Sequence, residues 1–380
     1  MPGTVRPIPG PLRIASNPIV DRREDLARAV VATQFERWPA LYARYGEAGR
    51  ERCVEDVGFH LLYLAEAVAS DSPALFREYV AWVKILFAGI GIPDGELGES
   101  LEILRDVVAA RVDPATAARV RACVGEGLSA LPGLPREAPS FVRPDAPLGA
   151  LARSYMDALL AGDRRRATAL VTEATAAGAT VPDLYLHVFQ PTLREIGRLW
   201  QTRAITVAHE HFATAATQAI MGQLYPAIFA AERRGLSMVA TCVSGEQHEI
   251  GVRMVADFFE MAGWDSHCLG ANTPANSIIH ALRERNARVL AVSATITAHV
   301  GRVAALVAAV RAEPWDQPPQ VLVGGYPFNL VPDLWRTVGA DAFAPGAQEA
   351  VAIAERLIGP AGPDRAVPDR AVPDRTAGVA

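Results

Sequence analysis

The segment "LSMVATCVSGEQHEIGVRMVADFFEMAG", residues 236–263, indicates the architecture of the last third of the chain. It opens with a short apolar run that contains several β-branched residues, which predicts a buried strand. A polar loop with Glu246 and His248 follows, and a helical pattern comes after it. A strand, a loop and a helix in this order are typical of the first unit of a doubly wound α/β domain.

The same alternation continues to the end of the folded sequence. Four more strands, separated by helical patterns, are predicted at residues 264–270, 287–295, 319–328 and 340–346. We therefore expect a flavodoxin-like, doubly wound parallel sheet of five strands over residues 235–359. Ligands of such sheets bind at the carboxyl ends of the strands, near the switch in strand order, and the loop with His248 is expected there.

The rest of the chain is predicted to be helical, so the fold class is α and α/β. Apolar residues spaced by three and four indicate an N-terminal helical bundle and then a four-helix cap bundle. A Pro-rich linker separates the two bundles, and the last residues repeat Pro-Asp-Arg and are expected to be disordered. The expected parts are an extended N-terminus (1–21), the bundle (22–131), the linker (132–147), the cap (148–234) and the tail (360–380).

Composition excludes several classes of function. The net charge of the 380 residues is −5, and Lys84 is the single lysine, so a DNA-binding surface is not expected. The cysteines are too far apart in sequence for a Cys-x-x-Cys site or a disulfide framework. The N-terminus lacks a signal-peptide pattern, and no apolar run reaches the ~18 residues of a membrane span. We expect a cytoplasmic protein.

His248 is the residue around which a site is expected. A lone histidine is more often structural than a ligand, but its neighbours favour a ligand. Glu246 can accept the proton of the imidazole nitrogen that does not bind a metal, which raises the basicity of the other nitrogen. The ends of the third and fourth strands should line the same crevice, and they carry Ser293, Thr295, Gly324 and Gly325.

These residues make segment 236–358 resemble a cobalamin-binding domain. The family pattern Asp-x-His-x-x-Gly, Ser-x-Leu or Ser-x-Thr, and Gly-Gly stands here as Glu246-x-His248-x-x-Gly251, Ser293-x-Thr295 and Gly324-Gly325. The resemblance implies that His248 binds cobalt from below in place of dimethylbenzimidazole, with Glu246 behind it. It also implies that the Ser, Thr and Gly residues line a pocket for the displaced nucleotide tail. Glu in place of Asp at position 246 is a departure from the pattern.

Segment 195–214 resembles the helical cap of methylcobalamin-carrying and light-sensing cobalamin proteins. Their Trp-x(9)-Glu-His pattern is matched by Trp200, Glu210 and His211. The likeness to light sensors of the CarH type implies that these residues and Val207 stand over the upper face of the corrin and shield an adenosyl group. Judged without the resemblance, Trp200 is as well explained as core, and Glu210 and His211 as a solvated helix face.

Three functions compete, and none makes the chain an enzyme by itself. In a light sensor, photolysis of adenosylcobalamin changes the packing of the cap and the assembly of a homodimer or larger homo-oligomer. In a methyltransferase system, the chain is a corrinoid carrier between partner enzymes. The third class is a cobalamin regulator that responds to redox state or ligands. The cap pattern and the helical domain ahead of it favour the light sensor, with an unknown downstream partner.

Two departures from the CarH type affect this hypothesis. Residues 22–131 do not resemble a winged helix, and Gln201 stands where a cobalt-capturing histidine follows the cap tryptophan. The layout is similar to that of the photocobilins, which also bind a bilin such as biliverdin. The sequence therefore leaves open whether this chain binds a second chromophore. The aromatic residues of the bundle are then either core or bilin contacts, namely Tyr79, Trp82 and Phe87.

Overall fold

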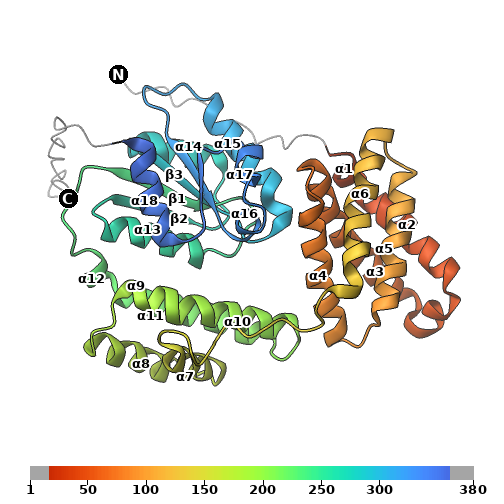
Figure 1. Cartoon of the computed structure of the whole chain (residues 1–380), viewed down its shortest axis with the longest axis horizontal. Coiled ribbons are helices and arrows are strands. Elements are labelled where there is room, and N and C mark those ends of the chain that lie inside the picture. Colours follow the sequence, from red (N-terminus) through yellow and green to blue (C-terminus); the bar gives the residue numbers. More distant parts are fainter. Residues whose placement is uncertain (1–16, 360–380) are drawn as a thin grey trace, which may run out of the picture.

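The computed structural model describes residues 17–359, and for residues 41, 42, 44 and 45 it describes the backbone alone. It contains an N-terminal helical bundle, a helical cap and an α/β domain (Figure 1). The expected tail 360–380, and residues 1–16 of the expected extended N-terminus, lie outside the described residues.

The N-terminal bundle packs its amphipathic helices around an apolar core. Leu26, Leu61 and Phe76, from three different helices, are fully buried in it. Its helices are α1 (Pro18–Asp21), α2 (Arg23–Arg37), α3 (Pro39–Ala69), α4 (Pro73–Gly89), α5 (Asp94–Ala109) and α6 (Pro114–Ala130).

The bundle begins earlier than the sequence analysis predicted. Residues 18–21 form helix α1 and are not extended. The Asn17 side chain accepts hydrogen bonds from the backbone N–H groups of Ile19 and Val20, at 3.0 and 3.4 Å. It also donates to the carbonyl of Ala65 on α3, at 3.2 Å, which ties this turn to the bundle. An Asn-Pro pair is a recognised helix start, and this signal was overlooked.

The linker after the bundle is fixed by the single lysine. The Lys84 ammonium is buried and donates to the carbonyl oxygens of Leu131 and Leu134, each at 2.7 Å. It also pairs with the Asp94 carboxylate at 3.2 Å. The short helix η1 (Leu131–Gly133) carries one of these carbonyls. A buried ammonium needs such partners, so Lys84 holds the start of the linker against the bundle.

The cap consists of four helical runs and one extra turn. Its third run is continuous and includes a π-helical turn, where one extra residue is accommodated. The elements are α7 (Gly149–Leu160), α8 (Arg164–Ala176), the run of α9 (Val181–Leu184), η2 (Tyr185–Phe189) and α10 (Gln190–Gln201), then α11 (Val207–Gln223) and α12 (Tyr225–Ile228).

The α/β domain contains the five-stranded parallel sheet that the sequence predicted, and its fold class is confirmed. The strand order β2-β1-β3-β4-β5 is that of a flavodoxin-like sheet. The order reverses at β1, so the loops after β1 and β3 lie at the switch point. The strands are β1 (Ser237–Cys242), β2 (Asp265–Gly270), β3 (Val289–Ser293), β4 (Gln320–Gly324) and β5 (Ala342–Ala344).

Helices cover both faces of this sheet. The N-terminal bundle and the cap both lie against the α/β domain. In Figure 1 the cap lies below the α/β domain and the bundle lies to the right of both. No helix among residues 17–359 is long and apolar enough to cross a bilayer. The helices of the domain are α13 (Ile250–Met261), α14 (Ala275–Glu284), η3 (Thr297–His299), α15 (Val300–Ala312), α16 (Tyr326–Leu330), α17 (Leu334–Thr337) and α18 (Ala347–Ile358).

A buried carboxyl group joins the cap to the α/β domain. The Tyr185 hydroxyl donates to Asp257 at 2.7 Å, and Asp257 is 6% exposed. Burial raises the pKa of Asp257 to about 6, although the hydrogen bond from Tyr185 acts in the opposite direction. The folded protein therefore binds this proton more tightly than the unfolded chain does, and the stabilisation is lost as the pH rises from about 4 to about 6.

Asp257→Asn should therefore stabilise the protein at neutral pH. Asparagine still accepts the Tyr185 hydrogen bond but carries no buried charge. We expect the free energy of unfolding to rise by about 1–3 kcal/mol at pH 7, and the gain to vanish near pH 4. Urea unfolding at several pH values measures this. The exposed Asp157 of α7 provides the control variant Asp157→Asn. If Asp257→Asn raises the free energy of unfolding equally at pH 7 and at pH 4, the explanation is wrong.

Candidate functional site

The loop between β1 and α13 presents His248 at the carboxyl edge of the sheet. The loop is held from two sides. Arg302 Nη1 donates to the carbonyl of Ser244 at 2.7 Å, and the Asn272 side chain accepts the N–H of Gly245 at 2.8 Å. Gly245 has a φ of 81°, a conformation that glycine adopts without strain. This support fixes the backbone just ahead of Glu246.

Glu246 is fully buried, and both of its oxygens are hydrogen-bonded. Oε1 accepts from the backbone N–H of His248 at 3.1 Å and from its Nδ1 at 2.5 Å. Oε2 accepts from the N–H groups of Thr295 and Ile296, at 2.8 and 3.1 Å, and lies 3.1 Å from Nδ1 of His299. Burial by itself would raise the pKa of this carboxyl. The hydrogen bonds from His248, His299 and Thr295 outweigh burial and hold the pKa well below its usual range.

His248 presents its second ring nitrogen to solvent. Because Nδ1 donates to Glu246, the lone pair of the neutral ring lies on Nε2. The side chain is 56% exposed, and no hydrogen bond reaches Nε2 from residues 17–359. The hydrogen bond with Glu246 raises the pKa of His248, which makes the ring a stronger base. An imidazole held by a carboxylate in this way is a typical metal ligand with its supporting partner.

The predicted residues at the strand ends lie along the same edge. Ser293 is paired in register with Cys242 of β1 on one side and with Gly324 of β4 on the other. Gly325 has a φ of 99°, and a Cβ atom there would lie 2.0 Å from the carbonyl oxygen of Ala294. The structure therefore brings the ends of β1, β3 and β4 together without side-chain bulk at the two glycines.

Gly251 lies in the first turn of α13, close to His248 in sequence. It is exposed, and a Cβ atom at this position would meet no heavy atom within 4 Å. The helix therefore offers an open backbone surface beside the histidine. A flat ring above His248 would meet no side chain at this position.

The cap places Glu210 and His211 near the beginning of α11. The Glu210 carboxylate lies 2.5 Å from Nδ1 of His211 and accepts the Thr214 hydroxyl at 2.9 Å. Glu210 is close enough to His248 to contribute to raising the pKa of that residue. Val207, at the start of the same helix, is 50% exposed. Among these cap residues, Glu210 is the one whose charge acts on the His248 side chain.

Trp200 stands apart from this group. Its side chain is 43% exposed at the end of α10, which does not fit the alternative of plain core. Within the described part of the chain, no hydrogen bond or ring contact joins the Trp200 side chain to the other predicted residues. Gln201, next to it, is buried and donates to the carbonyl of Trp82 on α4 at 3.0 Å. Gln201 therefore binds the bundle.

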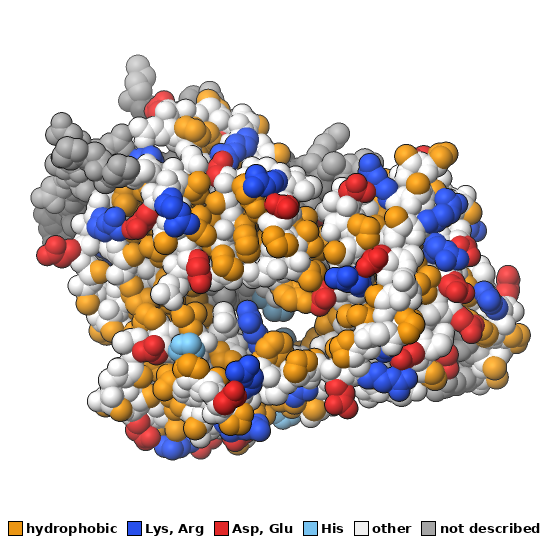
Figure 2. All heavy atoms as spheres, viewed as in Figure 1, with side chains coloured by type: hydrophobic (Ala, Val, Ile, Leu, Met, Phe, Trp, Pro, Cys, Tyr) orange, Lys and Arg blue, Asp and Glu red, His pale blue; other side chains and the backbone are white. Residues whose placement is uncertain are grey.

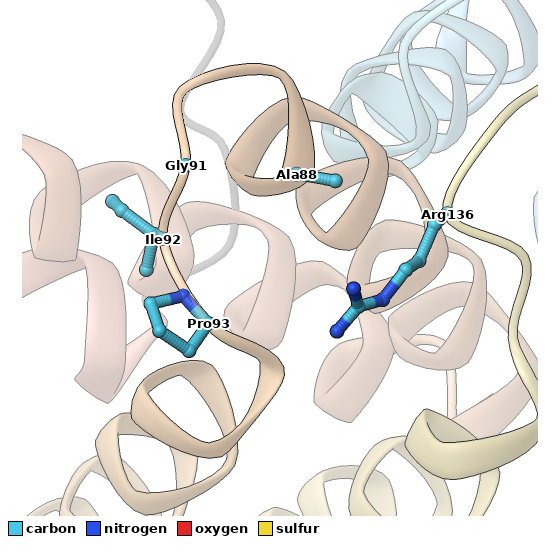
Figure 3. Close-up of a pocket in the computed structure, with 5 residues that line it drawn as sticks. All are labelled: Ala88, Gly91, Ile92, Pro93 and Arg136. Carbon is cyan, nitrogen blue, oxygen red and sulfur yellow. The ribbon is translucent and has the colours of Figure 1, made fainter.

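The three bundle aromatics considered as bilin contacts differ in exposure. Tyr79 is 5% exposed, and its hydroxyl lies 2.6 Å from Nδ1 of His60. Phe87 packs against the bundle core, so both residues have structural roles. Trp82 is 37% exposed. A cavity of about 280 Å³ in this part of the chain is lined by Ala88, Gly91, Ile92, Pro93 and Arg136 (Figure 3), and no residue around His248 lines it.

The arrangement fits a corrinoid. At the carboxyl edge of the sheet, the His248 ring has a carboxylate behind it, and the ends of β3 and β4 beside it approach closely at two glycines that carry no side chain. The cap lies opposite. Figure 2 shows a hollow where the α/β domain, the cap and the bundle meet, with hydrophobic and charged side chains around it. An apolar crevice with a few well-placed polar groups is the usual form of a cofactor site.

Sequence reasoning missed His299 and the backbone groups of Thr295 and Ile296. Thr295 was assigned to the wall of a tail pocket, and its N–H in fact binds Glu246. These groups follow β3 in a loop and a short 3-10 helix, where no fixed spacing marks them. The one available signal was the position of this loop at the switch point of the sheet.

Comparisons with known proteins match two ranges of the chain to cobalamin-binding domains. Residues 236–354 and residues 151–225 each match a family model described as "B12 binding domain". The chain is 28% identical over 171 residues to dimethylamine corrinoid protein 1 of Methanosarcina acetivorans. This match covers 44% of this chain and 78% of that protein. It is 31% identical over 117 residues to the dimethylamine corrinoid protein of Methanosarcina barkeri, and this match covers 30% of this chain and 54% of that protein.

A solved structure also matches. It is the monomethylamine corrinoid protein of Methanosarcina barkeri, with a TM-score of 0.48 and 19% identity over 55% of this chain and 99% of that one. The matches to B12-binding domains and corrinoid proteins support a cobalamin-binding protein, as predicted. The relatives are corrinoid proteins and not photoreceptors, so they favour the alternative of the sequence analysis over the light sensor. Both matched domain ranges begin after the bundle.

Proposed function

We propose that this chain is a corrinoid carrier of a methyltransferase system. In this function the chain holds cobalamin between the cap and the α/β domain and presents it to partner enzymes, and it does not catalyse a reaction alone. When bound, cobalamin supplies a cobalt that takes up and gives up a methyl group at its upper face. We also propose a cytoplasmic location.

One observation carries the proposal, namely the Glu246–His248 pair. The buried carboxylate fixes the ring through Nδ1 and leaves Nε2 exposed at the mouth of the crevice. A ring held in this way could bind the cobalt of cobalamin through Nε2. Glu246 stays ionised because its other oxygen is held by backbone N–H groups. It can therefore compensate positive charge on the histidine at every stage of a transfer.

The relatives support the carrier over other cobalamin proteins. Dimethylamine corrinoid protein 1 is covered over 78% of its length by this chain. The exposed Val207, on the cap side, leaves room for a small upper ligand. In this proposal Ser293, Gly324 and Gly325 line the place of the nucleotide tail, and partner methyltransferases approach from the cap side.

The test compares two forms of the cofactor in the full-length protein. We expect protein reconstituted in darkness to retain methylcobalamin through gel filtration and to lose its methyl group to an excess of a small thiol. A demethylation rate within about 10-fold of that of free methylcobalamin indicates an accessible upper face. If adenosylcobalamin alone is retained, the carrier function is wrong.

A light sensor is the second candidate, and the position of Trp200 favours it. This tryptophan is exposed beside the contact between α10 and the bundle, where Gln201 binds α4. A bulky adenosyl group would pack on Trp200, and its loss on photolysis would remove that contact. The states with and without the adenosyl group would then differ at Trp200, which could couple photolysis to a movement of the bundle. A bilin between bundle and cap, and a homodimer or larger assembly, belong to this candidate.

Trp200→Ala separates the two candidates. As a light sensor, the adenosylcobalamin-loaded parent should change its elution volume after green light, and the variant should bind cobalamin without that change. As a carrier, parent and variant should elute at the same volume in darkness and after light. The exposed Phe59 of α3 provides the control variant Phe59→Ala, which should behave as the parent does. An added far-red absorption band would indicate the bilin.

A further inference from the structure

The bundle reaches the segment that holds Glu246. Helix α3 contacts both η3 and α15, the elements that follow β3. Tyr63 and Glu66 are three residues apart on α3 and therefore share one face of that helix. Both matched B12-binding ranges exclude this helix, so the contact is an addition of this chain to the matched domains.

Glu66 makes the closer contact. Its carboxylate accepts the backbone N–H of Gly301 and, at 3.0 Å, the hydroxyl of Ser70. His299 and Arg302 lie close enough to counteract part of the rise in pKa that burial causes at Glu66. The fit is tight, because a Cβ atom on Gly301 would lie 2.9 Å from Oε2 of Glu66. The start of α15 is therefore packed directly on the bundle.

Tyr63 is held rigidly near Glu246. Its ring stacks on Tyr79 with centroids 3.9 Å apart, and the Tyr79 hydroxyl is hydrogen-bonded to the buried His60. Burial raises the pKa of Tyr63, and the charge of the Glu246 carboxylate adds to that rise. The stacked rings therefore fix the face of α3 that Tyr63 shares with Glu66, and this helix contacts η3 and α15.

The contacted segment is the one that fixes Glu246. Thr295, Ile296 and His299 all hold Oε2, and they lie within five consecutive residues. His299 is the last residue of η3, the element that contacts α3, and it is itself buried. A displacement of this segment would release Oε2 and leave the carboxylate free to turn away from His248.

We propose that the bundle controls how firmly His248 is held on cobalt, with His299 and Glu66 as positioning residues. Docked, the bundle keeps the segment 295–301 in place, so that Glu246 keeps its hydrogen bond to Nδ1. Undocked, the segment relaxes and the axial bond weakens. The inference rests on the proposed function in one respect, since it takes His248 as the axial ligand.

Thermodynamic linkage makes the effect reciprocal. If docking strengthens the His248–cobalt bond by some factor, formation of that bond strengthens docking by the same factor. A partner that binds the free face of the bundle could therefore loosen the lower ligand without contacting the corrin. The coupling needs only two positions of the bundle with different contacts at Glu66.

The experiment measures lower ligation directly in the full-length protein. Protein labelled with 15N-histidine is loaded with cobalamin and reduced to the Co(II) state. Electron paramagnetic resonance then gives the ratio of histidine-bound to histidine-free cobalt, because 15N splits each line into two and the 14N of dimethylbenzimidazole splits it into three. Glu66→Ala removes the acceptor for Gly301, and Gly301→Ala inserts a methyl group at the contact while favouring the helix. We expect His299→Phe to lower the ratio about 10-fold, and the two bundle-contact variants to lower it in the same direction.

Matched variants exclude a general loss of structure. Glu66→Gln keeps an acceptor for the Gly301 N–H, and His299→Asn keeps a donor for Oε2 of Glu246. Both variants should therefore keep most of the parent ratio. Glu55 is exposed on α3, and Glu55→Ala should leave the ratio unchanged. Circular dichroism confirms that each variant is folded.

Two results would overturn the inference. If His299→Phe lowers the ratio while Glu66→Ala and Gly301→Ala leave it at the parent value, the bundle has no influence on ligation. If all three variants match the parent, His299 is not a positioning residue either. Failure of the proposed function looks different, because parent protein without the 15N-histidine splitting would show that His248 does not bind cobalt.

Discussion

His248→Ala should weaken the retention of cobalamin by about 100-fold or more, because it removes the imidazole nitrogen that faces the crevice. Loss of a supporting partner of a metal ligand costs about 10-fold to 100-fold in affinity, and loss of the ligand should cost at least as much. In protein labelled with 15N-histidine, the two-line 15N splitting of the Co(II) resonance should disappear in the variant. Equilibrium dialysis with hydroxocobalamin measures the affinity.

Controls for this prediction lie on either side of the ligand. Glu246→Gln keeps the shape of the side chain and should weaken binding by about 10-fold, less than loss of the ring does. Gln247 is exposed in the same loop, and Gln247→Ala should leave affinity and spectrum at the parent values. If His248→Ala retains both the affinity and the 15N-histidine splitting of the parent, another histidine binds the cobalt.

The sheet and His248 could be predicted because their signals are local. Buried parallel strands read as apolar runs, and each was followed by a helical pattern. The order of these units then placed the loop after β1 at the switch point. The side chain of Glu246 two residues before His248 was enough to anticipate their hydrogen bond, which the structure shows at 2.5 Å.

The remaining parts of the site depend on tertiary contacts that no local pattern specifies. His299 reaches Glu246 only because the loop after β3 folds back onto the loop after β1. Gln201 was compared with a cobalt-capturing histidine, but it donates to Trp82 because the bundle packs on α10. The position of the bundle relative to the cap and the α/β domain could not be inferred from its own sequence. Its amphipathic helices predict a buried face but do not indicate which element packs on it.

Gly325→Ala should be the most destabilising single change at the edge of the site. Gly325 has a φ of 99°, and an added Cβ would lie 2.0 Å from the carbonyl oxygen of Ala294. That oxygen belongs to the backbone, so a side-chain rotation cannot relieve the clash. We expect the free energy of unfolding to fall by at least about 3 kcal/mol, from left-handed strain plus displaced backbone. Urea unfolding of the protein without cofactor measures it.

Gly339 separates the clash from the strain. It has a similar φ of 77°, lies in the same domain, and a Cβ there would meet Val307 at an ordinary 3.7 Å. Gly339→Ala should therefore cost only about 1 kcal/mol and leave cobalamin binding intact. Gly325→Ala should also weaken cobalamin binding, because Ala294 directly precedes Thr295, whose N–H holds Glu246. Equal losses of stability in the two variants would show that the approach of β4 to β3 is not what requires glycine at 325.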